Sequence, residues 1–168
     1  MSDITNLNSL VAAITSRLRG AGALIAIEGH STAGKTCLSK SLARACGGDS
    51  ISTDSYVDKV RNTDTYLGRI VLNKLAVALS QSRGKHPVVF IEGICLRDTL
   101  ASLNIAPQAF VYCKRITQAG LWADDPQNYL DGESPRSDLS WVDQQSVLYH
   151  LRASPLENAD IVYARHEE

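Results

Sequence analysis

Residues Gly29 to Thr36 read GHSTAGKT and fit the pattern G-x-x-x-x-G-K-[ST]. The glycines allow a tight turn with backbone angles that other residues resist, so that successive N–H groups can point inward around an anion. A helix that starts near Lys35 adds the positive end of its dipole at the same place. In this pattern the lysine reaches the β- and γ-phosphates of a nucleotide, and the threonine hydroxyl is placed for Mg²⁺. The spacing therefore predicts a binding loop for a nucleoside triphosphate and its magnesium ion.

We expect ATP and Mg²⁺ as the cofactors, although GTP fits the loop as well. The predicted contacts come from the whole loop: Gly29, His30, Ser31, Thr32, Ala33, Gly34, Lys35 and Thr36. The side chain of His30 is expected to point to solvent. The alternative is an ordinary strand-to-helix turn that happens to contain a lysine. The apolar run before the loop and the helical pattern after it favour the phosphate loop.

Two carboxylates that end predicted strands extend this site. Asp54 ends the stretch SISTD, and Glu92 ends VVFIE. Phosphoryl transfer needs metal ions, an acceptor and often a carboxylate that takes the acceptor's proton. We therefore assign Asp54 as the candidate catalytic base and a candidate metal ligand, and Glu92 as a residue that holds or orients Mg²⁺. The simpler alternatives are a helix N-cap at Asp54 and, at Glu92, a buried carboxylate that only accepts hydrogen bonds from nearby N–H groups.

Strand-like and helix-like segments alternate along the chain. Segments that read as strands lie at 23–28, 50–54, 87–93, 109–113 and 159–164, and those at 23–28 and 87–93 have the apolar pattern of buried strands. Helical spacing of apolar residues is found at 5–18, 35–46, 64–83, 95–103 and 140–152. This alternation predicts one α/β domain over residues 1–168 with a mainly parallel sheet. Ligands of such sheets bind beyond the carboxyl ends of the strands, where the glycine-rich loop and both carboxylates fall.

Four segments together resemble the uridine kinase and phosphoribulokinase family of P-loop kinases: GHSTAGKT, STDSYVDK, VVFIEGI and SPLENADIVY. In that family a D-[SD]-[FY]-Y-like segment follows the second strand, E-G-[IL] follows the third, and A-D-[IV]-[IV] forms a late strand. The resemblance implies a three-layer P-loop NTPase fold with a five-stranded parallel sheet, in the order 2-3-1-4-5, and a lid. It also implies that Asp54 activates an acceptor hydroxyl and that Glu92 lies near magnesium.

The chain departs from this family in two places. Family members have a longer segment between the aspartate and E-G-I, with a hairpin that closes over the nucleoside, whereas 55–91 here reads mostly as one helix without a hairpin. The family's lid is rich in arginines, which neutralise the transferred phosphoryl group. The lid expected here, at about 115–139, is acidic. Its candidate catalytic cations are Arg115, which is expected to start a lid helix, and Arg136. The alternative for Arg115 is a solvated helix arginine.

Four residues are candidates for contact with the acceptor. Arg61 is placed to grip an acidic group, and Asp64 to bond hydroxyls. Tyr56 is a candidate wall of the acceptor pocket, and Arg97, just past E-G-I, a candidate to face the cleft. Structural alternatives exist for three of them: a surface salt bridge for Arg61, a helix cap for Asp64 and simple packing for Tyr56.

Composition restricts the partners of the chain. Its 168 residues carry a net charge of −1, so there is no basic excess to neutralise a nucleic-acid backbone. No apolar run of roughly 18 residues is present, so no membrane span is expected, and the first residues lack the features of a secretory signal. The four cysteines contain no C-x-x-C pair and are interpreted as buried apolar residues in a reducing cytoplasm. The oligomeric state is left open.

The sequence thus predicts a small cytoplasmic kinase that moves the γ-phosphoryl group of ATP to a hydroxyl of a small molecule. The alternative is an ATP-binding module with weakened catalysis and a regulatory or partner-binding role, which the acidic lid favours. A GTP-switch protein is disfavoured, because no N-K-x-D precedes a strand and no D-x-x-G follows the third one.

Overall fold

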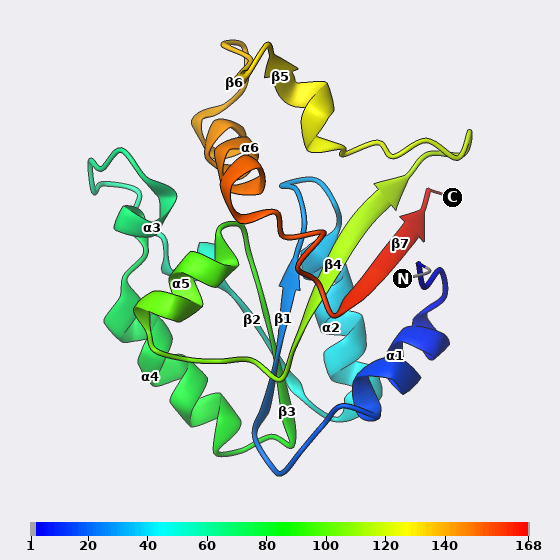
Figure 1. The fold of residues 1–168 in the computed structure, drawn as a ribbon. Coiled ribbons are helices and arrows are strands. Elements are labelled where there is room, and N and C mark those ends of the chain that lie inside the picture. Colours follow the sequence, from blue (N-terminus) through cyan, green and yellow to red (C-terminus); the bar gives the residue numbers. More distant parts are fainter. Residues whose placement is uncertain (1–2, 168) are drawn as a thin grey trace.

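Five parallel strands form a central sheet in the order β2-β3-β1-β4-β7 (Figure 1). The computed structural model describes residues 3–167. The strands are β1 (Ala23–Glu28), β2 (Asp49–Ser52), β3 (Val88–Glu92), β4 (Ala109–Ile116) and β7 (Ile161–His166). Counted among the strands of this sheet alone, the order is 2-3-1-4-5, as predicted. A separate two-stranded hairpin, β5 (Leu130–Asp131) with β6 (Ser134–Pro135), lies in the lid region.

Helices cover both faces of the sheet and make the fold three-layered (Figure 1). One face packs against α1 (Leu7–Thr15) and α2 (Lys35–Cys46), and the other against α3 (Tyr66–Arg69), α4 (Leu72–Arg83), α5 (Leu96–Ser102) and α6 (Trp141–Ala153). Alternate side chains of β1 enter the two cores, which is why this strand reads as a continuous apolar run. Within residues 3–167, no helix has the length and apolarity needed to cross a membrane.

The helix predicted over 64–83 is two helices. Ile70 has an extended backbone and forms an antiparallel bridge with Val57, and this bridge separates α3 from α4. Further backbone bonds run from Asp58 N to Arg69 O (2.8 Å) and from Val71 N to Tyr56 O (2.8 Å). The apolar spacing is satisfied either way, because Ile70 and Leu75 enter the same core from two short helices. The prediction that 55–91 is mostly one helix was therefore wrong. These contacts close a loop over 57–70 through one isolated bridge, and no hairpin of two strands forms in this segment.

Two predicted strand ends are also shifted. The second strand ends at Ser52, and Asp54 lies in the 3-10 helix η1 (Thr53–Tyr56). The fourth strand continues to Ile116, so Arg115 belongs to β4 and starts no lid helix. The lid contains instead the 3-10 helix η2 (Pro126–Tyr129) and the β5–β6 hairpin. Both shifts change the element that holds a candidate catalytic residue.

A close backbone approach at Gly93 fixes the relative position of the two carboxylate segments. A Cβ atom built on Gly93 would lie 1.9 Å from Thr53 Oγ1, a distance that no side chain can occupy. Thr53 is fully buried and precedes Asp54, while Gly93 follows Glu92. The absence of a side chain at Gly93 therefore lets the ends of β2 and β3 come together with their carboxylates.

Gly93→Ala is expected to lower the free energy of unfolding by about 1–3 kcal/mol, the usual cost of forcing an extra methyl group into a packed site. The matched control is Gly84→Ala, because Gly84 has a φ of −74° and the nearest atom to an added Cβ is 3.5 Å away. Denaturant unfolding of the two variants measures the difference. Equal stability of Gly93→Ala and Gly84→Ala would contradict this account of the contact.

Candidate functional site

The loop between β1 and α2 has the tight backbone that the sequence predicts. Gly29 and Gly34 have φ values of 143° and 88°, which favour glycine. A Cβ atom on Gly29 would lie 2.2 Å from the carbonyl oxygen of Cys113, so the loop packs directly on the backbone of β4. The Cys113 thiol also donates to Ala33 O at 3.3 Å. These contacts hold the loop at the carboxyl end of the sheet and leave α2 pointing its N-terminus toward it.

Lys35 is folded into the loop. Its side chain is 5% exposed, and Nζ donates to the carbonyl oxygen of His30 at 2.6 Å. Burial lowers the pKa of Lys35, while the negative charges of Glu92 and Asp54 favour the protonated form. An ammonium group held in this way has two further donors for a bound anion. The lysine is thus enclosed by the loop that the sequence pattern predicts to bind phosphate.

Thr36 and Glu92, both predicted to face magnesium, are in direct contact. The Thr36 hydroxyl donates to Glu92 Oε1 at 2.9 Å, and Glu92 is 2% exposed. Mg²⁺ in phosphate sites takes one or two protein oxygens and completes its shell with phosphates and waters. A hydroxyl and a carboxylate that already meet beside the phosphate loop fit this requirement. The alternative for Glu92 was a carboxylate that accepts hydrogen bonds from backbone N–H groups only. The hydrogen bond from Thr36 does not fit that alternative.

Asp54 lies in η1 with an exposed side chain, and it accepts a hydrogen bond from the hydroxyl of Tyr66. The N-cap of η1 is Ser52, so Asp54 does not serve as the helix cap that its alternative proposed. Its charge acts on Lys35, which places it within electrostatic reach of the loop. Sequence reasoning missed Tyr66, which orients the candidate base from α3.

The expectation that His30 points to solvent was wrong. Its side chain is 1% exposed and its ring stacks on Tyr129 of the lid, with the centroids 4.3 Å apart. Burial, and after it the charge of His150, lowers the pKa of His30 to about 4. The ring is therefore neutral at physiological pH and acts as a flat apolar contact between the loop and the lid.

A second contact ties the loop to α6. The Ser31 hydroxyl donates to one carboxylate oxygen of Asp143, and the other accepts from Ser140 Oγ at 2.6 Å. Ser140 also caps α6 through the backbone N–H of Asp143. The spacing of Ser140 and Asp143 resembles a capping box, but nothing in the sequence indicates that the same carboxylate also binds the loop. Asp143 and Tyr129 are thus site residues that sequence reasoning missed.

Neither candidate lid arginine projects freely into the site. Arg136 is exposed and pairs with Asp138, with Nη2 and Oδ2 2.6 Å apart. Arg115 pairs with Glu167, with Nε and Oε1 3.3 Å apart. The solvated helix arginine proposed as the alternative for Arg115 is also wrong, because the residue is part of β4.

The buried carboxylate of Asp124, which is 1% exposed, anchors the start of the lid to β4. It accepts from the backbone N–H of Arg115 at 2.9 Å and from Trp122 Nε1 at 2.5 Å. Burial raises the pKa of Asp124, while these two hydrogen bonds oppose the shift. The acidic character of the lid is therefore partly structural, since this carboxylate fixes the turn that follows β4.

The candidate acceptor residues are dispersed. Arg97 forms an ion pair with the buried Glu28, with Nε and Oε2 2.9 Å apart, and lies over the ring of Phe110. Arg61 donates to Gly68 O at 3.1 Å rather than to a surface carboxylate. Tyr56 packs against the core. Thr65, not Asp64, caps α3.

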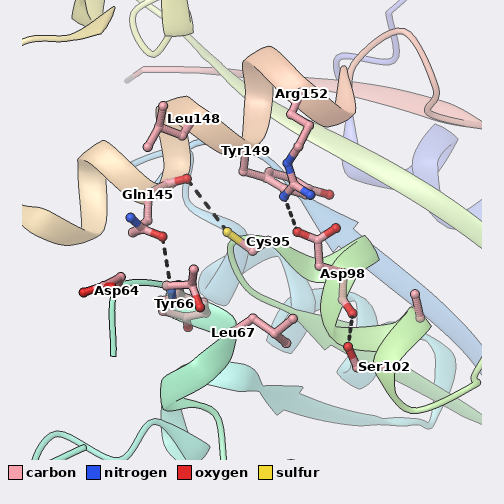
Figure 2. A pocket seen from close by; sticks show the side chains of 12 residues that line it. Asp64, Tyr66, Leu67, Cys95, Asp98, Ser102, Gln145, Leu148, Tyr149 and Arg152 are labelled. Carbon is pink, nitrogen blue, oxygen red and sulfur yellow. Dashed lines mark hydrogen bonds and ion pairs between the residues drawn. The ribbon is translucent and has the colours of Figure 1, made fainter. Parts of the chain in front are cut away.

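A cavity of about 590 Å³ lies between α3, α5 and α6 (Figure 2). Asp64 is the one predicted acceptor residue that lines it. Its inner wall includes Tyr66 and Tyr149, whose hydroxyls donate to Asp54 and to Glu28 at the end of β1. Near its rim Arg152 pairs with Asp98. Asp54 does not line the cavity, but Tyr66 on its wall connects the two through a hydrogen bond, and the cavity has room for a small molecule.

The fold resembles that of kinases of known structure. A possible uridine kinase from Bacillus stearothermophilus is similar at 14% identity with a TM-score of 0.62, over 94% of this chain and 96% of that one. A candidate fructose transport system kinase from Silicibacter (18% identity, TM-score 0.48, 98% and 100% coverage) and shikimate kinase from Bacteroides thetaiotaomicron (16%, 0.36, 84% and 86%) are more distant in shape. No family profile and no curated protein sequence matches the chain. The first comparison shows that the chain shares the α/β fold of that kinase.

The buried, neutral His30 predicts a pH dependence of stability. The unfolded chain protonates this ring below about pH 6.5, whereas the folded protein keeps it neutral down to about pH 4. Because the unfolded state binds the extra proton, stability falls as the pH drops through this interval. Between pH 7 and 5, the free energy of unfolding of the wild-type protein should fall by about 2 kcal/mol more than that of His30→Phe, which retains the stacking on Tyr129. Urea unfolding at both pH values measures this, and identical losses would show that His30 does not contribute.

Proposed function

We propose that the chain is an ATP-dependent phosphotransferase that acts on a hydroxyl group of a small molecule, as a uridine kinase does. The observation that carries this proposal is the meeting of Lys35, Thr36 and Glu92 at one loop. A buried ammonium, a hydroxyl and a buried carboxylate beside a tight glycine turn are the groups that a magnesium-bound triphosphate needs. A helix N-terminus adds to the attraction for the phosphates.

In this proposal the chain's residues divide the work of transfer. Loop N–H groups and Lys35 bind the phosphates, and Thr36 and Glu92 hold Mg²⁺, which supplies neutralisation of the phosphate charge. Asp54 accepts the hydroxyl proton as the acceptor oxygen forms its bond to the γ-phosphorus and the bond from that phosphorus to ADP breaks. Positioning and charge neutralisation supply most of the acceleration, because phosphoryl transfer needs little covalent help.

The acceptor is proposed to enter the cavity between α3, α5 and α6. Its reacting hydroxyl would approach Asp54 beside Tyr66, whose hydroxyl already bonds the same carboxylate. A volume of about 590 Å³ is within the range of small-molecule sites. Asp64 remains a candidate for contact with acceptor hydroxyls because it lines this cavity.

A second candidate function is an ATP-binding module with weakened catalysis and a regulatory or partner-binding role. The pairing of Arg115 with Glu167 and of Arg136 with Asp138 favours it, because kinases use free lid cations to stabilise the transferred group. Such a module would bind MgATP through the same loop. The two proposals differ in turnover and agree on nucleotide binding.

Acceptor-dependent release of ADP tests the kinase proposal. Purified protein with MgATP should release ADP only in the presence of one class of hydroxyl compound, among pools of nucleosides, sugars, vitamins and sugar phosphates. Asp54→Asn should lower this rate by about 10²–10⁴-fold, because it removes the proton acceptor, and should leave ATP affinity nearly unchanged. Asp131→Asn, an exposed lid carboxylate, is the matched control and should retain the wild-type rate.

Lys35→Ala should weaken both ATP binding and turnover. Binding of MgATP without acceptor-dependent release from any pool would favour the weakened module. Full activity of Asp54→Asn would show that this residue is not the catalytic base. Unchanged ATP affinity of Lys35→Ala would contradict the assignment of the loop as a phosphate-binding loop.

A further inference from the structure

A guanidinium group from the last strand lies against the phosphate loop, and the sequence gives no sign of it. Arg165 of β7 is the register partner of Arg115 on β4, at the carboxyl end of the sheet. A Cβ atom on Gly34 would lie 3.1 Å from both Cζ and Nη1 of Arg165, and 3.3 Å from its Nε. Three atoms at nearly equal distance show that the guanidinium packs closely on the backbone of Gly34.

Two other positive features lie beside this guanidinium. Gly34 is the N-cap of α2, where the unpaired N–H groups carry the positive end of the helix dipole. The next residue, Lys35, contributes a second, buried positive charge. Within residues 3–167, Arg165 makes no ion pair within 4.0 Å, and its buried Nε has no hydrogen-bond acceptor. Its neighbour Arg115, in contrast, pairs with Glu167.

From this geometry we infer that Arg165 binds a phosphate group of the nucleotide together with Lys35 and the N-terminus of α2. An anion placed there would accept from the guanidinium and from Lys35 and would lie at the positive end of α2, so the three groups would form one binding site. A planar guanidinium binds phosphate oxygens through two parallel N–H bonds, which an ammonium cannot do. The inference rests on the nucleotide binding proposed above and concerns the same site.

This role for Arg165 also explains how the nucleotide phosphates could be neutralised although both lid arginines are held in ion pairs. The cation would come from the central sheet, where β7 holds it in place without a lid movement. A fixed cation needs no ordering when the nucleotide binds, so its contribution to affinity is not reduced by lost side-chain freedom.

The test compares Arg165→Gln and Arg165→Lys with wild-type protein. Affinities for MgATP and for magnesium tripolyphosphate, which has no base or ribose, are measured by competition against a fluorescent ATP analogue. We expect Arg165→Gln to weaken both ligands by about tenfold or more, the scale of a lost hydrogen bond to a charged group. Arg165→Lys should recover part of the loss, since it restores the charge without the planar geometry.

The matched control is Arg44→Gln. Arg44 is exposed in the last turn of the same helix, so this variant removes the same charge at the opposite end of α2. Its affinities should equal those of wild type. Without ligand, Arg165→Gln should melt at the same temperature as wild type or higher, because it relieves repulsion; a structural arginine would instead lower the melting temperature when removed.

Three outcomes would overturn the inference. Wild-type affinity of Arg165→Gln for MgATP would show that the guanidinium does not touch the nucleotide. A lower affinity of Arg165→Gln for MgATP with unchanged affinity for tripolyphosphate would show that Arg165 contacts the base or ribose instead of a phosphate. Failure of wild-type protein to bind either ligand would instead reject the proposed nucleotide site as a whole, and the inference with it.

Discussion

The structure depends on the buried positive charge of Lys35. The loop around it contains no acidic side chain that could neutralise this charge. Lys35 is almost fully enclosed, and an isolated buried ammonium is costly unless opposite charges or acceptors surround it. The loop meets this need with the carbonyl of His30, and the strand ends meet it with Glu92 and Asp54. The close contact between Gly93 and Thr53 brings those strand ends together. The parallel sheet thus serves to gather compensating groups around one lysine.

The loop is joined to the lid and α6 by two contacts of different kinds. His30 stacks on Tyr129, and Ser31 bonds Asp143. Both partners follow the buried Asp124, which fixes the start of the lid on β4. A ligand that rearranges the loop would therefore act on the lid and on α6 at the same time. This coupling gives the acidic lid a structural role that does not require free cations.

The alternation of strands and helices and the position of the glycine-rich loop follow from sequence patterns, because they depend on local spacing, whereas the sheet order came from the family resemblance. The sequence placed Thr36 and Glu92 at the same edge of the sheet but did not predict the hydrogen bond between them. The break at Ile70 does not follow from sequence patterns, since two short helices bury the same apolar residues as one long helix. The buried state of His30 and the ion pair of Arg97 depend on which segments meet across the fold. No local pattern contains that information.

The most direct test of the central claim is a calorimetric titration of the wild-type protein with ATP, once with Mg²⁺ and once with a chelator. If Lys35, Thr36 and Glu92 form a site for a magnesium-bound triphosphate, one ATP should bind per chain. Its affinity should increase at least about tenfold, or about 1.4 kcal/mol, when Mg²⁺ is present. Absence of binding under both conditions would contradict the account. Equal affinity with and without Mg²⁺ would show that Thr36 and Glu92 do not serve the metal.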